Sequence, residues 1–333
     1  GTTPLYMAAC EGADAVVVAL LEAGARVDAA DDNGNTALHF AAFAGANDAA
    51  SALLAAGAGV EAQNDEGNSV LQVAAMEGHA DTALLLIGAG AAVDARSDNG
   101  VTALFIAAQE GHAPVVVKLL EAGADVSAGD DEGYMPIHVA AAAGSADTVR
   151  ALLAAGADVN ARAVDLRTPV YMAAHVGHAD IVRLLAGAGA DVDAACEDGT
   201  TPLYMAACEG ADAVVVALLE AGARVDCAPA SGITPLYVAA ERDHVGVMNI
   251  LLSARANVNA RAHEDGWTPL HVAALNGHTA ALGVLLGAGA DAQLASTHRF
   301  DKFPARSTPA DIARRTGHAA AKALLAAAPA RGA

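Results

Sequence analysis

The sequence has few aromatic residues, and it has no long uninterrupted apolar stretch. Aromatic residues make up 3% of the chain although hydrophobic residues make up 54%, so the interior must be built mainly from closely packed Ala, Val and Leu. The apolar stretches are short and interrupted by glycine, below the roughly 18 residues that a membrane-spanning helix requires. This pattern excludes a transmembrane helix and predicts no insertion into a membrane.

Positive charge is also scarce. The chain has 18 Lys and Arg against 39 Asp and Glu, which gives a formal net charge of −21. Proteins that bind phosphate backbones rely on Lys and Arg to release counterions from the polyanion. The charge balance therefore argues against DNA, RNA and anionic lipid surfaces as partners.

The cysteines are few, and they show neither the Cys-x-x-Cys pattern nor the spacing of a zinc site. The four are Cys10, Cys196, Cys208 and Cys227. We expect them to be buried, reduced thiols, and this usage indicates a cytoplasmic or nuclear compartment.

A 33-residue repeat runs through the whole chain. A motif of the type Thr-Pro-Leu-His or Thr-Pro-Leu-Tyr recurs at this step, with one later step of 34 residues and one of 40. Most copies continue with Ala-Ala, two variable residues, Gly-His or Gly-Ala, a Val- and Leu-rich run, and Gly-Ala-Asp-Val. Ten copies predict one repeat domain over residues 1–333. They start near Thr3, Thr36, Ser69, Thr102, Met135, Thr168, Thr201, Thr234, Thr268 and Thr308.

Each part of the repeat has a mechanical role. Thr at the start can cap a helix, and Pro at the first helical position loses nothing by lacking an N–H. The Ala-Ala pair allows neighbouring helices to approach closely, and the next Gly can end the helix in the left-handed conformation. A second helix follows, as in the run Val115–Leu120, and Gly123 closes it. The polar Asp-, Glu- and Gly-rich segment that remains suits a hairpin between repeats.

Tandem units of this length that carry Thr-Pro-Leu-His and Ala-Ala-x-x-Gly-His closely resemble the ankyrin repeat. The resemblance covers essentially the whole chain. It implies an all-α repeat solenoid of stacked helix-turn-helix units with short β-hairpin loops, arranged as a curved right-handed array. It also implies a monomeric protein–protein interaction scaffold whose concave face is formed by hairpin tips and first helices. Asn160 and Asn259 match the position at which some eukaryotic ankyrin proteins resemble substrates of an asparaginyl hydroxylase.

Three repeats depart from the pattern at a turn or a cap. Leu166 replaces the hairpin glycine, Asp243 replaces the glycine between the helices, and Met135 replaces the capping Thr. We expect strained or remodelled turns there, at roughly 1 kcal/mol each.

The ends of the chain differ from its middle. The segment 297–306 lengthens the last hairpin and adds Phe300, Lys302 and Phe303, which could form a contact loop, and we expect residues 329–333 to fray. Residues 1–28 recur letter for letter as residues 199–226, an offset of 198, which indicates a duplication of six repeats. The start shows no signal sequence and no initiator Met, so we expect an array cut from a longer one.

No residue cluster predicts catalysis, a metal or a cofactor. Most of the 12 histidines fall on two repeat positions, which indicates a scaffold role. His175 and His178 form a close pair, but no thiol or carboxylate at ligand spacing joins them. The glycines recur at structural positions, and no nucleotide-binding or nucleophile motif is present. We predict that the chain is not an enzyme and needs no cofactor.

Paired carboxylates recur at the hairpin tips. The first acidic residue of a pair can support the turn, whereas the second is less required by the fold. Its repetition would leave a stripe of negative charge that steers a basic segment of a partner and weakens with salt. The pairs are Asp31-Asp32, Asp65-Glu66, Asp131-Glu132, Glu197-Asp198 and Glu264-Asp265.

The candidates for partner binding stand at repeat positions that vary and that the resemblance places on the concave side. Aromatic and Arg side chains on an exposed surface commonly carry binding energy, so Trp267, the only Trp, is the first choice. The alternative for Trp267 is packing against the lengthened loop. The predicted contact residues are Trp267, Tyr134, Phe43, Met76, Asp32, Glu66, Glu110, Arg167, Glu241, Arg242 and Leu275.

A second interpretation uses the same surface. The array could be a regulatory or targeting module of a larger protein, such as a channel, a kinase or a ligase, whose activity lies outside these residues. A parent reading frame that continues into a catalytic or membrane domain would favour this second interpretation.

Overall fold

The computed structural model describes residues 3–262, 265–299 and 303–328, and they fold into helix pairs. Contacts divide the chain into two compact units, residues 1–164 (unit 1) and residues 165–333 (unit 2). Within the described ranges there are helices and hairpin loops but no β-strand, only isolated bridges such as Ala30 with Thr36 and Gln63 with Ser69. The predicted all-α repeat fold is confirmed. None of the helices described is long and apolar enough to cross a membrane.

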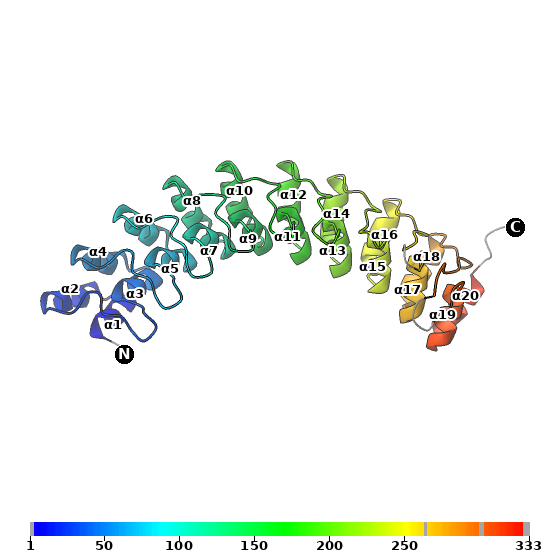
Figure 1. The fold of residues 1–333 in the computed structure, drawn as a ribbon, viewed down its shortest axis with the longest axis horizontal. Helices are drawn as coiled ribbons and strands as arrows, with labels where there is room; N and C mark the ends of the chain where they lie inside the picture. The colour runs from blue at the N-terminus through cyan, green and yellow to red at the C-terminus, as the bar shows by residue number, and fades with distance from the viewer. Residues whose placement is uncertain (1–2, 263–264, 300–302, 329–333) are drawn as a thin grey trace. The chain divides into compact units, whose positions relative to one another are not determined.

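The described residues of unit 1, 3–164, form five helix pairs in chain order (Figure 1). Its first helices begin at the motif starts, and its second helices follow after a short turn. The pairs are α1 (Pro4–Cys10) with α2 (Asp14–Glu22), α3 (Ala37–Ala44) with α4 (Asn47–Ala55), α5 (Val70–Met76) with α6 (Ala80–Gly88), α7 (Ala103–Gln109) with α8 (Ala113–Glu121), and α9 (Pro136–Ala143) with α10 (Ala146–Ala154).

The part of unit 2 that the structure describes forms five more pairs of the same kind. They are α11 (Pro169–Val176) with α12 (Ala179–Gly187), α13 (Pro202–Glu209) with α14 (Asp212–Glu220), α15 (Pro235–Glu241) with α16 (Val245–Ser253), α17 (Pro269–Asn276) with α18 (Thr279–Gly287), and α19 (Pro309–Thr316) with α20 (Ala319–Ala327).

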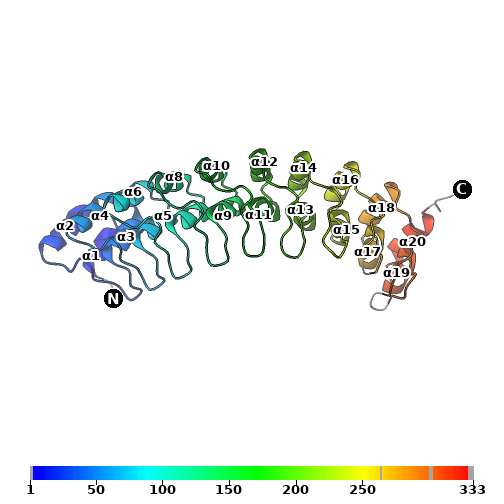
Figure 2. The same ribbon diagram turned by 45° about the horizontal axis from the view of Figure 1, so that its top comes forward.

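Within each unit, every first helix packs against its own second helix and against the first helix of the next repeat. The Ala-Ala pairs make this close approach possible, because Ala41, Ala42, Ala74 and Ala75 have no exposed surface. In unit 1 the hairpin loops extend past the first helices, on the side away from the second helices (Figure 2). This side of unit 1 therefore combines hairpin tips with first helices.

The capping residues act as predicted. The Thr102 hydroxyl accepts a hydrogen bond from the backbone N–H of Phe105 at 3.3 Å, and Thr168 accepts one from Tyr171 at 3.4 Å. Each satisfies an N–H that would otherwise lack a partner at the start of a helix.

The recurring histidines join neighbouring repeats. Nε2 of His79 donates to the carbonyl of Phe43, and Nε2 of His112 donates to the carbonyl of Met76, each at 3.0 Å. In unit 2, His244 makes the same bond to the carbonyl of Cys208. These bonds tie the start of a second helix to the end of the first helix of the preceding repeat.

The departures from the repeat pattern produce the expected backbone strain. Leu166 and Asp243 have φ of 63° and 59°, a left-handed conformation that disfavours any side chain with a Cβ. Met135 lacks a hydroxyl, and its own N–H is satisfied by Nδ1 of His138 at 3.0 Å. Arg255 and Arg306 share the left-handed conformation, at 67° and 68°, at turns where no strain was predicted.

Replacing Arg255 with glycine is expected to stabilise unit 2 by about 0.5–1 kcal/mol, because the strain disappears while the unfolded chain gains some entropy. The equivalent residues Gly222 and Gly289 have φ of 93° and 87°, and Arg255 itself is exposed. Urea denaturation of the full chain measures the change. Arg255→Ala is the control, since it removes the charge and keeps the strain. An equal gain from both variants would contradict a backbone cause.

The burial of the cysteines differs from expectation, and part of the predicted loop and tail lies outside the described residues. All four cysteines are free thiols, but only Cys196 and Cys208 are buried, whereas Cys10 and Cys227 are half-buried. The expectation of four buried thiols was therefore wrong, since Cys10 and Cys227 lie where no neighbouring side chain covers them fully. The contact loop at Phe300 and Lys302 and the frayed tail at residues 329–333 lie outside the described residues.

Candidate functional site

A hollow of about 300 Å³ lies on the hairpin side of unit 1. It opens beside the first helices α1, α3 and α5 and the hairpins that lead into α3 and α5. Its volume is at the lower end of the range for ligand pockets, so it suits one or two side chains and not a large cofactor. The residues that line it are Cys10, Asn35, His39, Phe40, Phe43, Asn64, Glu66, Asn68, Val73, Met76 and Glu77.

The helix side of the hollow is apolar. Phe40 stacks on Tyr6 with ring centroids 4.3 Å apart, which holds the Phe40 ring in place. Phe43 and Met76 are 51% and 39% exposed, although large apolar side chains are usually covered in a monomer. The hollow thus offers unburied apolar surface on a rigid base.

The hairpin side of the hollow is polar and ordered by asparagines. Nδ2 of Asn64 donates to Oδ1 of Asn35 at 3.1 Å, which joins the two hairpins. Oδ1 of Asn64 accepts the backbone N–H groups of Glu66 and Asn68 at 3.1 and 3.0 Å. Nδ2 of Asn68 then donates to the Glu66 carboxylate at 3.1 Å, so this carboxylate is held at the rim.

His39 lies at the base of the hollow as a neutral side chain. Its Nδ1 accepts the backbone N–H of Thr36 at 3.2 Å, and its Nε2 donates to the carbonyl of Asn68 at 3.3 Å. Only a neutral ring can accept the N–H of Thr36 at Nδ1, and burial lowers the pKa of His39 from its ordinary value of 6.5, which favours the same uncharged form. The described residues that line the hollow include Glu66 and Glu77 but neither Lys nor Arg.

The negative charge of the protein is concentrated on unit 1. Residues 1–164 contain 5 Lys and Arg and 22 Asp and Glu, a net charge of −17, whereas residues 165–333 contain 13 and 17, a net charge of −4. Several of the few cations of unit 1 are already engaged. Lys118 pairs with Glu121 at 2.9 Å, and Arg96 donates to the carbonyls of Gly100 and Gly129.

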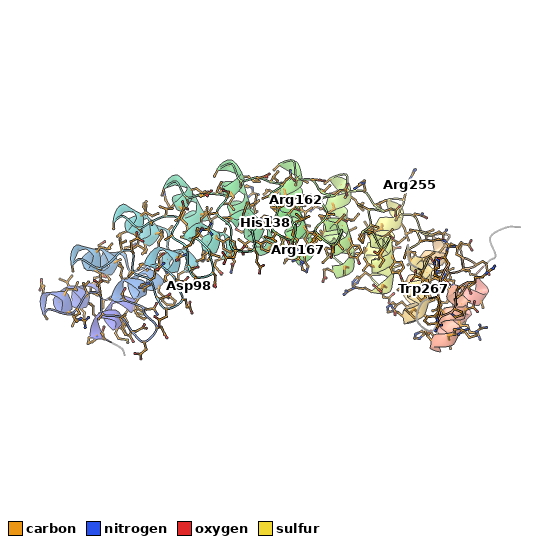
Figure 3. All side chains as sticks on the ribbon, in the orientation of Figure 1. Asp98, His138, Arg162, Arg167, Arg255 and Trp267 are labelled. Atoms are coloured by element: carbon orange, nitrogen blue, oxygen red, sulfur yellow. The ribbon has the colours of Figure 1, made fainter. Side chains whose placement is uncertain are left out.

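Acidic residues of unit 1 are exposed at successive hairpin tips. Asp98 is labelled at one of them in Figure 3. The acid that supports the turn differs from pair to pair. In Glu197-Asp198 it is the second acid, whose Oδ1 accepts the N–H of Thr200 at 2.8 Å. In Asp31-Asp32 it is the first acid, as predicted, since Oδ1 of Asp31 accepts the N–H groups of Asn33 and Asn35 at 2.9 and 2.8 Å. These bonds lower the pKa of Asp31 even though burial alone would raise it. The more exposed tip residues form an acidic ridge that consists of Asp32, Asp65, Glu66, Asp98, Asp131 and Glu132.

The structure brings three of the predicted contact residues together. Phe43, Met76 and Glu66 all line the hollow. Asp32 and Glu110 are exposed, at a hairpin tip and at the end of α7. Tyr134 is half-buried and lies edge-on to His138, with centroids 5.7 Å apart.

The predicted contact residues of unit 2 do not form such a cluster. Arg167 is half-buried, with its Nε 3.2 Å from the Asp165 carboxylate, and its guanidinium lies 5.6 Å from the centre of the Tyr171 ring. Glu241 and Arg242 are exposed at the end of α15, whereas Leu275 on α17 is half-buried.

Trp267 is a correction. It is only 1% exposed, so it cannot be an exposed contact residue. Its ring stacks on His271, with centroids 5.8 Å apart, and meets Phe303 edge-on at 5.7 Å. The alternative of packing against the lengthened loop is the one the structure supports, because Phe303 of that loop covers the indole.

Comparison with known protein families agrees with this architecture. The family model described as Ankyrin repeats (3 copies) matches residues 1–64, 52–130, 71–163, 137–229 and 225–296. The chain belongs to the ankyrin repeat family. Ankyrin repeats are generally protein–protein interaction modules, and the family is typically a non-enzymatic scaffold. No curated protein matched the chain.

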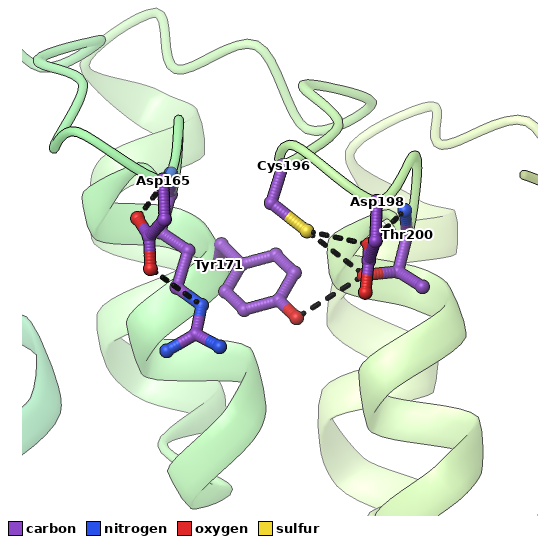
Figure 4. A network of polar contacts seen from close by, with 6 residues as sticks. Asp165, Tyr171, Cys196, Asp198 and Thr200 are labelled. Atoms are coloured by element: carbon purple, nitrogen blue, oxygen red, sulfur yellow. Dashed lines mark hydrogen bonds and ion pairs between the residues drawn. The ribbon is translucent and has the colours of Figure 1, made fainter.

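A polar network in unit 2 of this ankyrin repeat protein is structural (Figure 4). The Tyr171 hydroxyl lies 3.2 Å from the Thr200 hydroxyl, and the Cys196 thiol donates to the Asp198 carboxylate at 2.9 Å. Burial raises the pKa of Tyr171 to about 12, so it stays protonated. Tyr171 stands at the repeat position that His39 occupies in unit 1. Each of the two residues joins its first helix to the hairpin of the next repeat. Within the described residues, no group of three His, Cys, Asp or Glu could hold a metal ion.

Sequence reasoning predicted Phe43, Met76 and Glu66 as contact residues but missed the other residues that line the hollow. They are Cys10, Asn35, His39, Phe40, Asn64, Asn68, Val73 and Glu77. The available signal was the size of the residues at two first-helix positions in consecutive repeats, where Cys10, Phe43 and Met76 share one position and Phe40 and Val73 share the other. The ankyrin pattern shows where these positions lie, but only the packing shows that they leave a gap.

Proposed function

We propose that this ankyrin repeat protein binds a basic segment of a partner protein through the hairpin tips and first helices of unit 1. The observation that carries the proposal is the net charge of −17 on residues 1–164 against −4 on residues 165–333. A surface rich in exposed carboxylates raises the rate at which a positively charged partner associates. The acidic ridge lies on the same side of unit 1 as the exposed Phe43 and Met76, so charge and apolar surface coincide.

Neutralising three carboxylates on unit 1 is expected to weaken partner capture by on the order of ten-fold at low salt. The variant is Glu66→Gln, Glu77→Gln and Glu110→Gln, all exposed in the structure. Capture from cell extract at about 0.05 M and about 0.5 M salt, read by mass spectrometry, measures the effect, because salt screens exposed charges. The loss should be smaller at high salt.

The control changes the same number of exposed charges on unit 2, with Glu197→Gln, Glu209→Gln and Glu241→Gln. We expect this variant to retain its partners. Equal losses in the two variants, or capture that does not change with salt, would show that the acidic surface of unit 1 does not carry binding.

A further inference from the structure

We propose that the hollow beside α1, α3 and α5 is an anchor site for a partner segment in which one or two large apolar side chains stand next to Lys or Arg. This inference rests on the proposed function and adds the place and the chemistry of the contact. It concerns unit 1 alone.

The apolar part of the site requires a large apolar anchor. Phe43 and Met76 come from successive repeats at the same position of the first helix, and both remain exposed at the edge of the hollow. Phe40 and Val73 lie further in, and the stack of Phe40 on Tyr6 keeps that surface from collapsing inward. A side chain that enters removes apolar surface from water on both sides, which is how hot spots of interfaces gain their energy.

The rim adds a charge requirement. Glu66 and Glu77 stand on the hairpin side and the helix side of the hollow, and Asn68 holds the Glu66 carboxylate at 3.1 Å. His39 is neutral, so no cation of the lining compensates these carboxylates. An acidic or uncharged segment would cover these carboxylates without bringing a compensating positive charge. A Lys or Arg beside the apolar anchor completes the site electrostatically.

Selection from a random peptide display library against the full chain tests the inference. We expect enriched peptides to combine large apolar residues with adjacent Lys or Arg. The double variant Phe43→Ser/Met76→Ser should bind the selected peptides at least about ten-fold more weakly. Both side chains are exposed, so the variant should keep its fold, which circular dichroism checks.

The matched control is Val18→Ser/Leu84→Ser. These two side chains are exposed apolar residues of unit 1 as well, at 41% and 48%, but they lie on the second helices α2 and α6. This variant should bind the selected peptides as the unchanged protein does.

Thiol labelling gives an independent readout. Cys10 lines the hollow and is half-buried, and Cys227 is half-buried in unit 2. A bound peptide should slow labelling of Cys10 several-fold and leave Cys227 unchanged.

The outcomes separate the inference from the proposed function. Peptides that bind both double variants equally, or that leave Cys10 unprotected, would overturn the anchor site while salt-dependent capture on unit 1 still stood. Enriched peptides without Lys or Arg would overturn the charge requirement. Peptides that bind as expected, together with extract capture that does not depend on Glu66, Glu77 and Glu110, would overturn the proposed function instead.

Discussion

Replacing Trp267 with alanine is expected to lower the free energy of unfolding of unit 2 by about 3–5 kcal/mol. The indole is 1% exposed and lies between His271 on α17 and Phe303 of the loop that precedes α19. Removing it leaves a cavity that these two rings cannot fill without moving toward each other and giving up their present packing. Urea denaturation followed by circular dichroism measures the loss, and hydrogen exchange should place it at α17 and α19.

The control for this prediction is Tyr134→Ala. Tyr134 occupies the same position of its repeat and also contacts the histidine four residues later, although it meets His138 edge-on whereas Trp267 stacks on His271. Tyr134 is half-buried, and no lengthened loop covers it. We expect its replacement to cost less than half as much. A loss of less than about 1 kcal/mol for Trp267→Ala would mean that the indole is not an essential part of the packing.

The fold could be predicted from the sequence because each repeat contains the local signals that start, pack and end its helices. Thr102, the Ala-Ala pair at Ala107 and Ala108, and Gly111 set a cap, a close contact and a turn by local rules alone. Leu166 and Asp243 could be recognised as strained because they stand where other repeats have glycine. Because the same local signals recur in ten repeats, the positions of the helices and of the turns between them could be predicted correctly.

Burial depends on neighbours, and the repeated sequence shows this directly. Residues 1–28 and 199–226 are identical, yet Val16 is 51% exposed and the equivalent Val214 is fully buried. In the structure α14 packs against α12 and α16, whereas α2 packs against α4. The same letters therefore give two environments. Sequence reasoning from one repeat could not decide which residues of it are covered.

The site could be predicted only in part, because the sequence shows which positions vary but not which of them are covered by neighbours. Phe43, Met76 and Glu66 were found because they stand at variable positions that the ankyrin pattern exposes. Trp267 was assigned wrongly because the longer loop after α18 brings Phe303 against its ring. The charge difference between units 1 and 2 was present in the sequence, but it becomes meaningful only once the units are defined.

Lowering the pH is expected to destabilise unit 2 through His271, and His271→Gln should remove this effect. Burial lowers the pKa of His271 from its ordinary value of 6.5 to about 4. The unfolded chain then binds a proton more readily than the folded one, so the contribution is complete above pH 6.5 and is lost as the pH falls toward 4. The full effect is about 3 kcal/mol, of which about 2 kcal/mol is lost by pH 5.

Glutamine is a matched replacement because the protein already uses it at this position of the third repeat. Oε1 of Gln72 accepts the N–H of Ser69 at 2.7 Å, and its Nε2 donates to the carbonyl of Val101 at 2.8 Å. His271 makes the same two kinds of bond, through Nδ1 to the N–H of Thr268 at 3.1 Å and through Nε2 to the carbonyl of Ser307 at 3.2 Å. The variant should therefore match the unchanged protein at pH 7.5.

Urea denaturation at pH 7.5 and pH 5 compares the two proteins, with His298→Gln, an exposed histidine of the same unit, as the control. The unchanged protein and the control should each lose about 2 kcal/mol more than His271→Gln does. Equal losses in all three would mean that His271 accepts a proton while folded. Its bond to the Thr268 N–H would then have to break, and the cap of α17 with it, because a protonated Nδ1 cannot accept that hydrogen bond.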